Sequence, residues 1–244
     1  MENIEALTLG EIVKENYKAA AILEKYSLDF CCMGEQNFLE ACKVSNLAPS
    51  LVIHELQQIR EEQGDGSDFN SWPLDLLVDY VCQRHHAYVE EKTPLLNGYL
   101  DKVSEVHGAN HPELHEIKRI FLEIGGELTV HMKKEEFVLF PFIKKLERAR
   151  GTKLPVSSPL FGTVSNPVSM MKTDHAVEGE KFKRIAALTN NYKLPPDACN
   201  TYALTYQLLK EYERDLHMHI HLENNILFPK AVELEKEIGV SGFF

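Results

Sequence analysis

The amino-acid sequence predicts an all-α protein, an up-down four-helix bundle preceded by a small helical domain. Apolar residues recur at helical spacings through most of the 244 residues, and almost nothing alternates with the period of two that strands need. Segments rich in Gly, Pro, Asn and Ser separate these patterns into a short first group and four long ones. We therefore expect a helical domain over 1–62, a linker over 63–72 and the bundle over 73–244.

Two amphipathic patterns predict helices within the first 62 residues. The stretch LGEIVKENYKAAAILEKY has apolar residues at helical spacings, namely Leu9, Ile12, Val13, Ala20 and Leu23. The stretch NLAPSLVIHELQQIREE gives another pattern, with Pro49 near its start, where the first turn of a helix accepts proline. The segment QGDGSDFNSW that follows has no periodicity, so we interpret it as the linker.

Four long helical patterns follow Pro73. They cover approximately 73–103, 111–149, 166–191 and 197–237. The segments VHGANHP, GTKLPVSSPLFGT and NNYKLPP separate them, and each contains residues that end helices. Four long helices joined by three connections are typical of a bundle.

Composition excludes several classes of function. The formal net charge of -11, with no dense stripe of Lys or Arg, argues against a nucleic-acid partner. No apolar run approaches the roughly 18 residues of a membrane span. The first residues lack the pattern of an export signal, and the five cysteines are scattered, so we expect a reducing, cytoplasmic location.

An internal repeat is the most informative feature of the sequence. HMKKEEFVLFP (131–141) and HIHLENNILFP (219–229) share the pattern H-x-x-x-E-x-x-x-L-F-P, 88 positions apart. A further histidine precedes each copy in the preceding helix: His86 lies 45 positions before His131, and His175 lies 44 positions before His219. The repeat therefore predicts two helical hairpins of matching design.

This spacing predicts a metal centre between the two hairpins. Residues four apart on a helix share one face, so each copy can present one imidazole and one carboxylate to the bundle axis. A single such pair is usually a surface ion pair, but two matched copies with matched partner histidines favour metal binding. The candidate ligands are four imidazoles and two carboxylates: His86, His131, Glu135, His175, His219 and Glu223.

The donor set narrows the choice of metal. Mixed nitrogen and oxygen donors suit iron or manganese and also accept zinc. Six protein ligands on two metals leave coordination positions open for small molecules such as O₂ or NO. The ferritin-like plan uses Glu-x-x-His motifs, which this sequence lacks, so that class is disfavoured.

Several neighbouring residues keep alternative interpretations. His85 competes with His86, although the symmetric spacing favours His86. Cys82 is expected in the core. Three carboxylates could accept hydrogen bonds from the ligands or relay protons, or could be ordinary solvated groups: Glu127, Asp174 and Asp215. The flanking histidines of HMHIH have no counterpart in the first copy: His217 and His221.

The adjacent cysteines Cys31 and Cys32 are the candidate catalytic residues. They could exchange thiols, bind a metal across a dimer or simply pack in the core, and the sequence does not choose among these roles.

These motifs resemble those of the Repair of Iron Centers proteins, di-iron proteins that repair iron-sulfur clusters. LDFCCMGEQ is similar to the family's Asp-x-Cys-Cys signature, and it places Asp29, Cys31 and Cys32 on that motif. RHHAYVEEKTP, HMKKEEFVLFP, KTDHAVEGE and HLENNILFP resemble its four ligand-bearing segments, with the same six candidate ligands. The resemblance implies a hemerythrin-like bundle that binds two non-haem iron ions, with an oxo or hydroxo bridge.

The resemblance also implies a function. It predicts a cytoplasmic homodimer that responds to nitrosative or oxidative stress and restores damaged iron-sulfur proteins, by donating iron or processing NO. Two other functions stay open: an enzyme that reduces NO or O₂, and a hemerythrin-like gas binder or sensor. The sequence therefore does not decide whether the protein is an enzyme.

Overall fold

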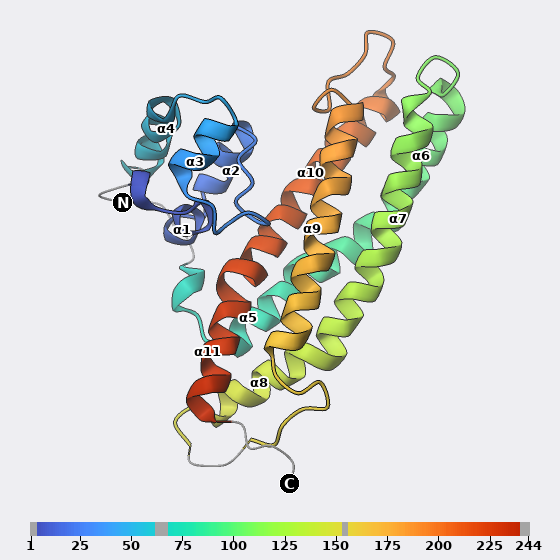
Figure 1. Ribbon diagram of the computed structural model, residues 1–244. Helices are drawn as coiled ribbons and strands as arrows, with labels where there is room; N and C mark the ends of the chain where they lie inside the picture. The colour runs from blue at the N-terminus through green and yellow to red at the C-terminus, as the bar shows by residue number, and fades with distance from the viewer. Residues whose placement is uncertain (1–3, 62–67, 153–155, 240–244) are drawn as a thin grey trace.

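The computed structural model describes residues 4–61, 68–152 and 156–239. Within these ranges the chain forms helices and no β-strand, with an isolated β-bridge between Thr8 and Asn37. Figure 1 shows the long helical rods of the bundle side by side and a smaller N-terminal helical unit beside them. The prediction of an all-α bundle with a helical N-terminal region is therefore confirmed.

The N-terminal unit consists of short helices: η1 (Ile4–Ala6), α1 (Leu9–Glu15), α2 (Ala19–Lys25), α3 (Phe38–Val44) and α4 (Pro49–Glu61). Thr8 begins α1 with a capping box, because its side chain accepts from the Glu11 amide while Glu11 accepts from the Thr8 amide. The first amphipathic pattern forms two helices rather than one. Asn16 is extended and its side chain accepts from the Lys18 amide, which ends α1.

The bundle begins after the short helix η2 (Phe69–Ser71). Its first rod contains α5 (Leu74–Tyr80), η3 (Val81–His86) and α6 (Ala87–His107). The second contains α7 (Glu113–Lys134), η4 (Glu135–Leu139) and α8 (Phe140–Ala149). The third is α9 (Ser165–Leu188), and the fourth contains α10 (Asn200–His221), η5 (Leu222–Leu227) and α11 (Phe228–Ile238).

Three of the four rods contain one π-helical segment, η3, η4 and η5. In each, an amide bonds the carbonyl five residues earlier: Ala87 to Cys82, Phe140 to Glu135, and Phe228 to Glu223. Proline follows two of these segments, at Pro141 and Pro229, and its missing N–H prevents the ordinary helical bond there. Such widened turns occur mostly at functional sites.

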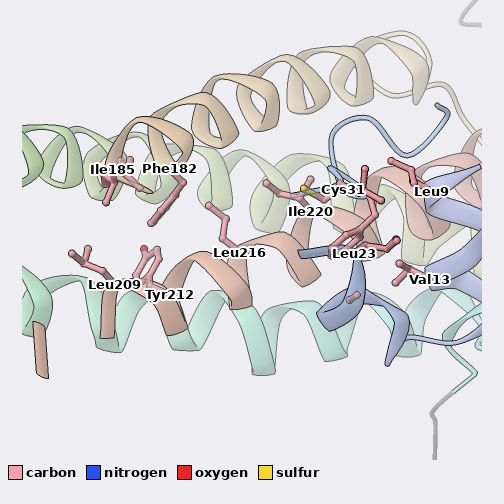
Figure 2. Close-up of a cluster of buried hydrophobic side chains, with 14 of the residues drawn as sticks. Leu9, Val13, Leu23, Cys31, Phe182, Ile185, Leu209, Tyr212, Leu216 and Ile220 are labelled. Carbon is pink, nitrogen blue, oxygen red and sulfur yellow. The ribbon is translucent and has the colours of Figure 1, made fainter. Parts of the chain in front are cut away.

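Two apolar cores lie on either side of a polar layer. The first core joins the N-terminal unit to the bundle, and Figure 2 shows Leu23 and Cys31 of that unit near Ile220 of α10. The second core gathers the apolar residues of α5, α8 and α11. The layer between the two cores carries the buried histidines and glutamates described below.

None of the helices in the described ranges is long and apolar enough to span a membrane.

Candidate metal centre

The six candidate ligands meet in the polar layer of the bundle. The first rod supplies one at the end of η3, the third supplies one from the middle of α9, and the second and fourth supply two each across their junctions with η4 and η5. Each is at most 3% exposed, although all six are polar: His86, His131, Glu135, His175, His219 and Glu223. Polar side chains so deeply buried need partners.

One group of four contains His86, His219 and both glutamates. The Nε2 atoms of His86 and His219 are 3.2 Å apart. His86 Nε2 lies 3.4 Å from Glu135 Oε2, and His219 Nε2 lies 3.1 Å from Glu223 Oε1. All four donor atoms lie within 4.8 Å of one another, which is the spacing of ligands around one ion.

The second group of four contains His131, His175 and the same two glutamates. The Nε2 atoms of His131 and His175 are 3.1 Å apart. His131 Nε2 lies 3.3 Å from Glu135 Oε1, and His175 Nε2 lies 3.2 Å from Glu223 Oε2. The two groups therefore share both carboxylates, and each carboxylate turns one oxygen to each group.

Apart from the facing imidazoles, the glutamate oxygens have no hydrogen-bond donor in the described part of the chain. Both oxygens of Glu135 and both of Glu223 are buried and unbonded, apart from the facing imidazoles. Leaving a buried carboxylate without donors is costly, whereas a cation would satisfy it. Two imidazoles and two carboxylate oxygens facing each of two points fit a pair of metal ions.

Electrostatics within the layer also favours cations. Burial lowers the pKa of His86, but Cys82, Glu135 and Glu223 outweigh burial and raise it to about 12. Burial likewise lowers the pKa of His131, while Glu135 and Glu223 raise it to about 9. Without a metal, protons on these imidazoles balance the glutamate charges. Metal ions would take the place of those protons.

Three of the four histidines have an outer partner that fixes the ring. The Nδ1–H of His86 donates to Glu136 at 2.9 Å, and that of His131 donates to Asp174 at 3.3 Å. The Nδ1–H of His175 donates to Asn224 Oδ1 at 2.9 Å. Because Nδ1 carries the proton, Nε2 is left free to bind a metal.

The structure separates the neighbouring histidines from the centre. His85 pairs with Asp215 at 3.1 Å, and its ring stacks on that of His219, so His86 is the one that faces the glutamates. His217 lies 3.3 Å from Glu24, and His221 lies 3.0 Å from the Asn225 amide.

The structure confirms the expected contacts for some of the other residues near the candidate ligands and not for others. Asp174 contacts a candidate ligand, as one interpretation predicted, whereas Asp215 contacts His85 and Glu127 pairs with Lys181 on the surface. Cys82 packs against the second core as expected, and its thiol also lies near His86 and Glu136.

Sequence analysis missed two partners of the centre, Glu136 and Asn224. Glu136 directly follows a candidate ligand, so its helix position could have indicated it. Asn224 follows Glu223 in the same way, so the repeat could have indicated its bond to His175, but nothing in the sequence indicated its second contact, with the N-terminal unit. Its amide donates to the Cys31 carbonyl oxygen at 3.2 Å, which links that unit to His175.

The candidate catalytic cysteines lie beside the centre and not within it. They occupy a turn between α2 and α3 of the N-terminal unit. The Cys32 thiol donates to the backbone carbonyl of His175 at 3.5 Å. Asp29, the third residue of the motif, forms an ion pair with Lys183 of α9 at 3.1 Å.

A helical bundle that buries shared glutamates and facing histidines belongs to the hemerythrin-like class of cation-binding proteins. Residues 78–231 match the profile of the hemerythrin HHE cation binding domain, and this chain belongs to that family. Residues 5–60 match ScdA_N, a domain of unknown function (DUF542).

Relatives align with nearly the whole chain. It is 33% identical over 228 residues to the iron-sulfur cluster repair protein YtfE of Yersinia pseudotuberculosis, covering 93% of this chain and 97% of the relative. It is 34% identical over 225 residues to the protein of the same name from Escherichia coli O157:H7, covering 92% and 96%. The resemblance to proteins that repair iron-sulfur clusters is thereby confirmed.

Proposed function

We propose that this protein binds two iron ions with His86, His131, Glu135, His175, His219 and Glu223, and uses them to repair damaged iron-sulfur clusters. The observation that carries the proposal is the sharing of both glutamates by the two groups of donors. If both carboxylates bridge, each ion would have two imidazoles and two carboxylate oxygens. This donor set suits iron.

A bound iron pair supplies redox chemistry and positions for small ligands, and it can release iron. The residues of the chain set the conditions for that chemistry. Glu136, Asp174 and Asn224 hold three imidazoles with Nε2 directed inward. The two apolar cores restrict water on either side of the layer. Four neutral imidazoles and two carboxylates would leave a diferrous centre with a net positive charge, which would favour binding of anionic or polarisable ligands.

The relatives support the choice of repair among the functions that such a centre permits. Both aligned relatives are named iron-sulfur cluster repair proteins, and the alignment includes the N-terminal unit as well as the bundle. Damaged iron-sulfur proteins are therefore the proposed partners, and NO or O₂ the proposed small ligands. The cytoplasmic location and the homodimer implied by the resemblance stay predictions.

The direct test is repair of an iron-sulfur enzyme inactivated by NO. The protein is purified without oxygen and its iron is counted. The recovery of enzyme activity is then followed in the presence of a chelator that competes for free iron. Parent protein should restore activity and lose iron in proportion. Glu135→Ala and Glu223→Ala variants should hold little iron and restore little activity, because each removes a donor from both groups. Repair by either variant at the parent rate contradicts the proposal.

Reduction of NO or O₂ is the second candidate function, and Glu178 favours it. This residue lies one helical turn after His175 and is 3% exposed. Burial and Glu127 raise the pKa of Glu178 to about 8, so its carboxyl group is mostly protonated at neutral pH. A buried acid on the same face of α9 as His175 could supply protons that reduction of these gases consumes.

Turnover separates the two functions. Consumption of many NO molecules per protein in the presence of an electron donor supports the reductase. Iron loss in proportion to the number of repaired clusters supports repair by donation of iron. A stable, reversible oxygenated spectrum would instead support the gas binder.

A further inference from the structure

A second cluster of metal-ligating side chains lies on the N-terminal unit. The Sγ atoms of Cys31 and Cys32 are 3.7 Å apart, and Cys31 Sγ lies 3.3 Å from Asp29 Oδ1. One donor atom from each residue lies within 4.8 Å of the other two. None of these residues belongs to the histidine and glutamate groups of the bundle.

The spacing agrees with ligation of a single ion. Two thiolates bound to one tetrahedral ion at about 2.3 Å stand about 3.7 Å apart, and a carboxylate oxygen at about 2.1 Å stands about 3.6 Å from each. The observed separations of 3.7 and 3.3 Å lie within a few tenths of an ångström of these values. The third pair, Cys32 Sγ and a carboxylate oxygen of Asp29, lies within 4.8 Å, so side-chain rotation would bring all three donors to one ion.

The backbone turn holds this arrangement in place. Asp29 Oδ1 accepts from the Cys32 amide at 2.9 Å and from the Met33 amide at 3.4 Å. These bonds fold the turn so that neighbouring side chains, which diverge in extended chains, converge instead. The cluster is thus formed before any ligand arrives.

A disulfide is a poor alternative for these two cysteines. Consecutive Cα atoms are about 3.8 Å apart across a trans peptide, less than the roughly 4.4–6.8 Å that disulfides span. All peptide bonds in the described ranges are trans. The geometry therefore favours two separate sulfurs that can act as ligands.

Charge and access also suit a cation. Two thiolates and one carboxylate would carry three negative charges, and Lys183 alone forms an ion pair with the cluster in the described chain, through the other oxygen, Asp29 Oδ2. Cys31 is buried, whereas Asp29 and Cys32 are partly exposed, so an ion could enter from solvent. A methyl group at Gly179 would stand 3.2 Å from the Cys32 sulfur, so the glycine leaves room for that side chain against α9.

We propose that Asp29, Cys31 and Cys32 form a separate site for one divalent first-row metal ion, of the class of ferrous iron, cobalt or zinc. Its fourth position is open to solvent or to a ligand from a partner. Binding releases the protons of both thiols to water, and no electron is transferred. The site does not depend on the proposed repair function.

Cobalt titration tests the site in the full-length protein. The protein is first loaded with iron to two ions per chain, the number that the bundle centre would hold, it is kept reduced without oxygen, and Co²⁺ is then added. Only cobalt bound to thiolate gives a sulfur-to-cobalt charge-transfer band in the near ultraviolet, and the bundle centre contains no thiolate. We expect one cobalt ion per chain, the band, and no loss of iron.

Matched variants identify the thiolates that give rise to the charge-transfer band. Cys31→Ser and Cys32→Ser should each abolish it, while the helical circular dichroism and the iron content stay at parent values. Asp29→Asn should weaken cobalt binding at least tenfold. The exposed Cys199 serves as a control, so Cys199→Ser should keep the band unchanged.

Three results overturn the proposal. The first is cobalt that binds only by displacing iron, or that gives no charge-transfer band. The second is a band that persists in Cys31→Ser and Cys32→Ser but vanishes in Cys82→Ser, which would assign the cobalt to the thiol near His86. The third is a thiol count showing a Cys31–Cys32 disulfide in protein purified under reduction. Iron content is measured separately throughout, so failure of this site is distinguishable from failure of the bundle centre.

Discussion

Replacing Asn224 by alanine tests whether the bond from His175 to Asn224 supports the metal centre. Asn224 is 7% exposed and makes two bonds, accepting from His175 Nδ1 at 2.9 Å and donating to the Cys31 carbonyl at 3.2 Å. Asn225 is a matched control. It donates to the Phe30 carbonyl at 3.1 Å and to His221 Nδ1 at 3.0 Å, and neither is a candidate ligand.

The structure predicts different losses of stability and of metal affinity for the Asn224→Ala and Asn225→Ala variants. Asn224→Ala leaves the buried Nδ1–H of His175 without an acceptor, at a cost of about 1–3 kcal/mol. Loss of an outer partner of a ligand lowers metal affinity by roughly 10–100-fold. Asn225→Ala also removes two bonds to neighbouring groups, so it should destabilise the fold by about 1–2 kcal/mol. Its metal affinity should stay at the parent value.

The assay combines competitive chelation with urea unfolding of the metal-loaded and metal-free proteins. Asn224→Asp is the conservative variant, because it keeps an acceptor for His175 while losing the donor to Cys31. It should restore most of the metal affinity. Equal loss of affinity in the Asn224→Ala and Asn225→Ala variants would refute the reasoning, as would parent affinity in Asn224→Ala.

Three further predictions concern charge in the bundle. Infrared spectra at neutral pH should contain the carbonyl stretch of a buried protonated carboxyl group, and Glu178→Gln should remove it, because the pKa of Glu178 is raised to about 8. Metal binding at pH 7 should release about two protons per chain from the bundle, since His86 and His131, with pKa values raised to about 12 and 9, are protonated in the metal-free protein. Apparent metal affinity should therefore fall as the pH is lowered. Chelation should lower the midpoint of thermal unfolding, because it removes ions that bind the folded protein, in which the donors of Glu135 and Glu223 are brought together.

Each of these predictions has a contrary outcome. A carbonyl stretch that persists in Glu178→Gln would assign the proton to another group. Calorimetry in buffers of different ionisation enthalpy counts the protons, and no buffer dependence would contradict the proton release. An unfolding midpoint that chelation leaves unchanged would show that metal binding does not stabilise the fold.

The repeat was the feature of the sequence that predicted most of the fold. Two copies of one motif, each with a leading histidine, gave the number of long helices and the pairing of the hairpins. The position of the polar layer followed, because residues four apart share a helix face. The structure brings all six predicted side chains together, and it places His86 rather than His85 toward the glutamates.

Features that depend on tertiary contacts could not be predicted from the sequence. Two of the π-helical segments, η4 and η5, lie in the buried layer and are followed by a proline, but a hydrophobic period of 3.6 does not reveal the one extra residue in such a turn. The role of Asn224 depends on the docking of a unit 193 positions earlier in the chain. The short distance between Asp29 and the Cys31 sulfur likewise depends on a turn, which the Asp29 side chain closes by accepting from the Cys32 amide.

The central claim is that two metals share Glu135 and Glu223, and X-ray absorption at the iron edge tests it most directly. Protein loaded with iron without oxygen should contain two irons per chain and show iron-to-iron scattering at roughly 3–4 Å. Glu135→Ala and Glu223→Ala should lose this scattering. A parent protein with a single isolated iron, or with two irons and no scattering at that distance, would contradict the account.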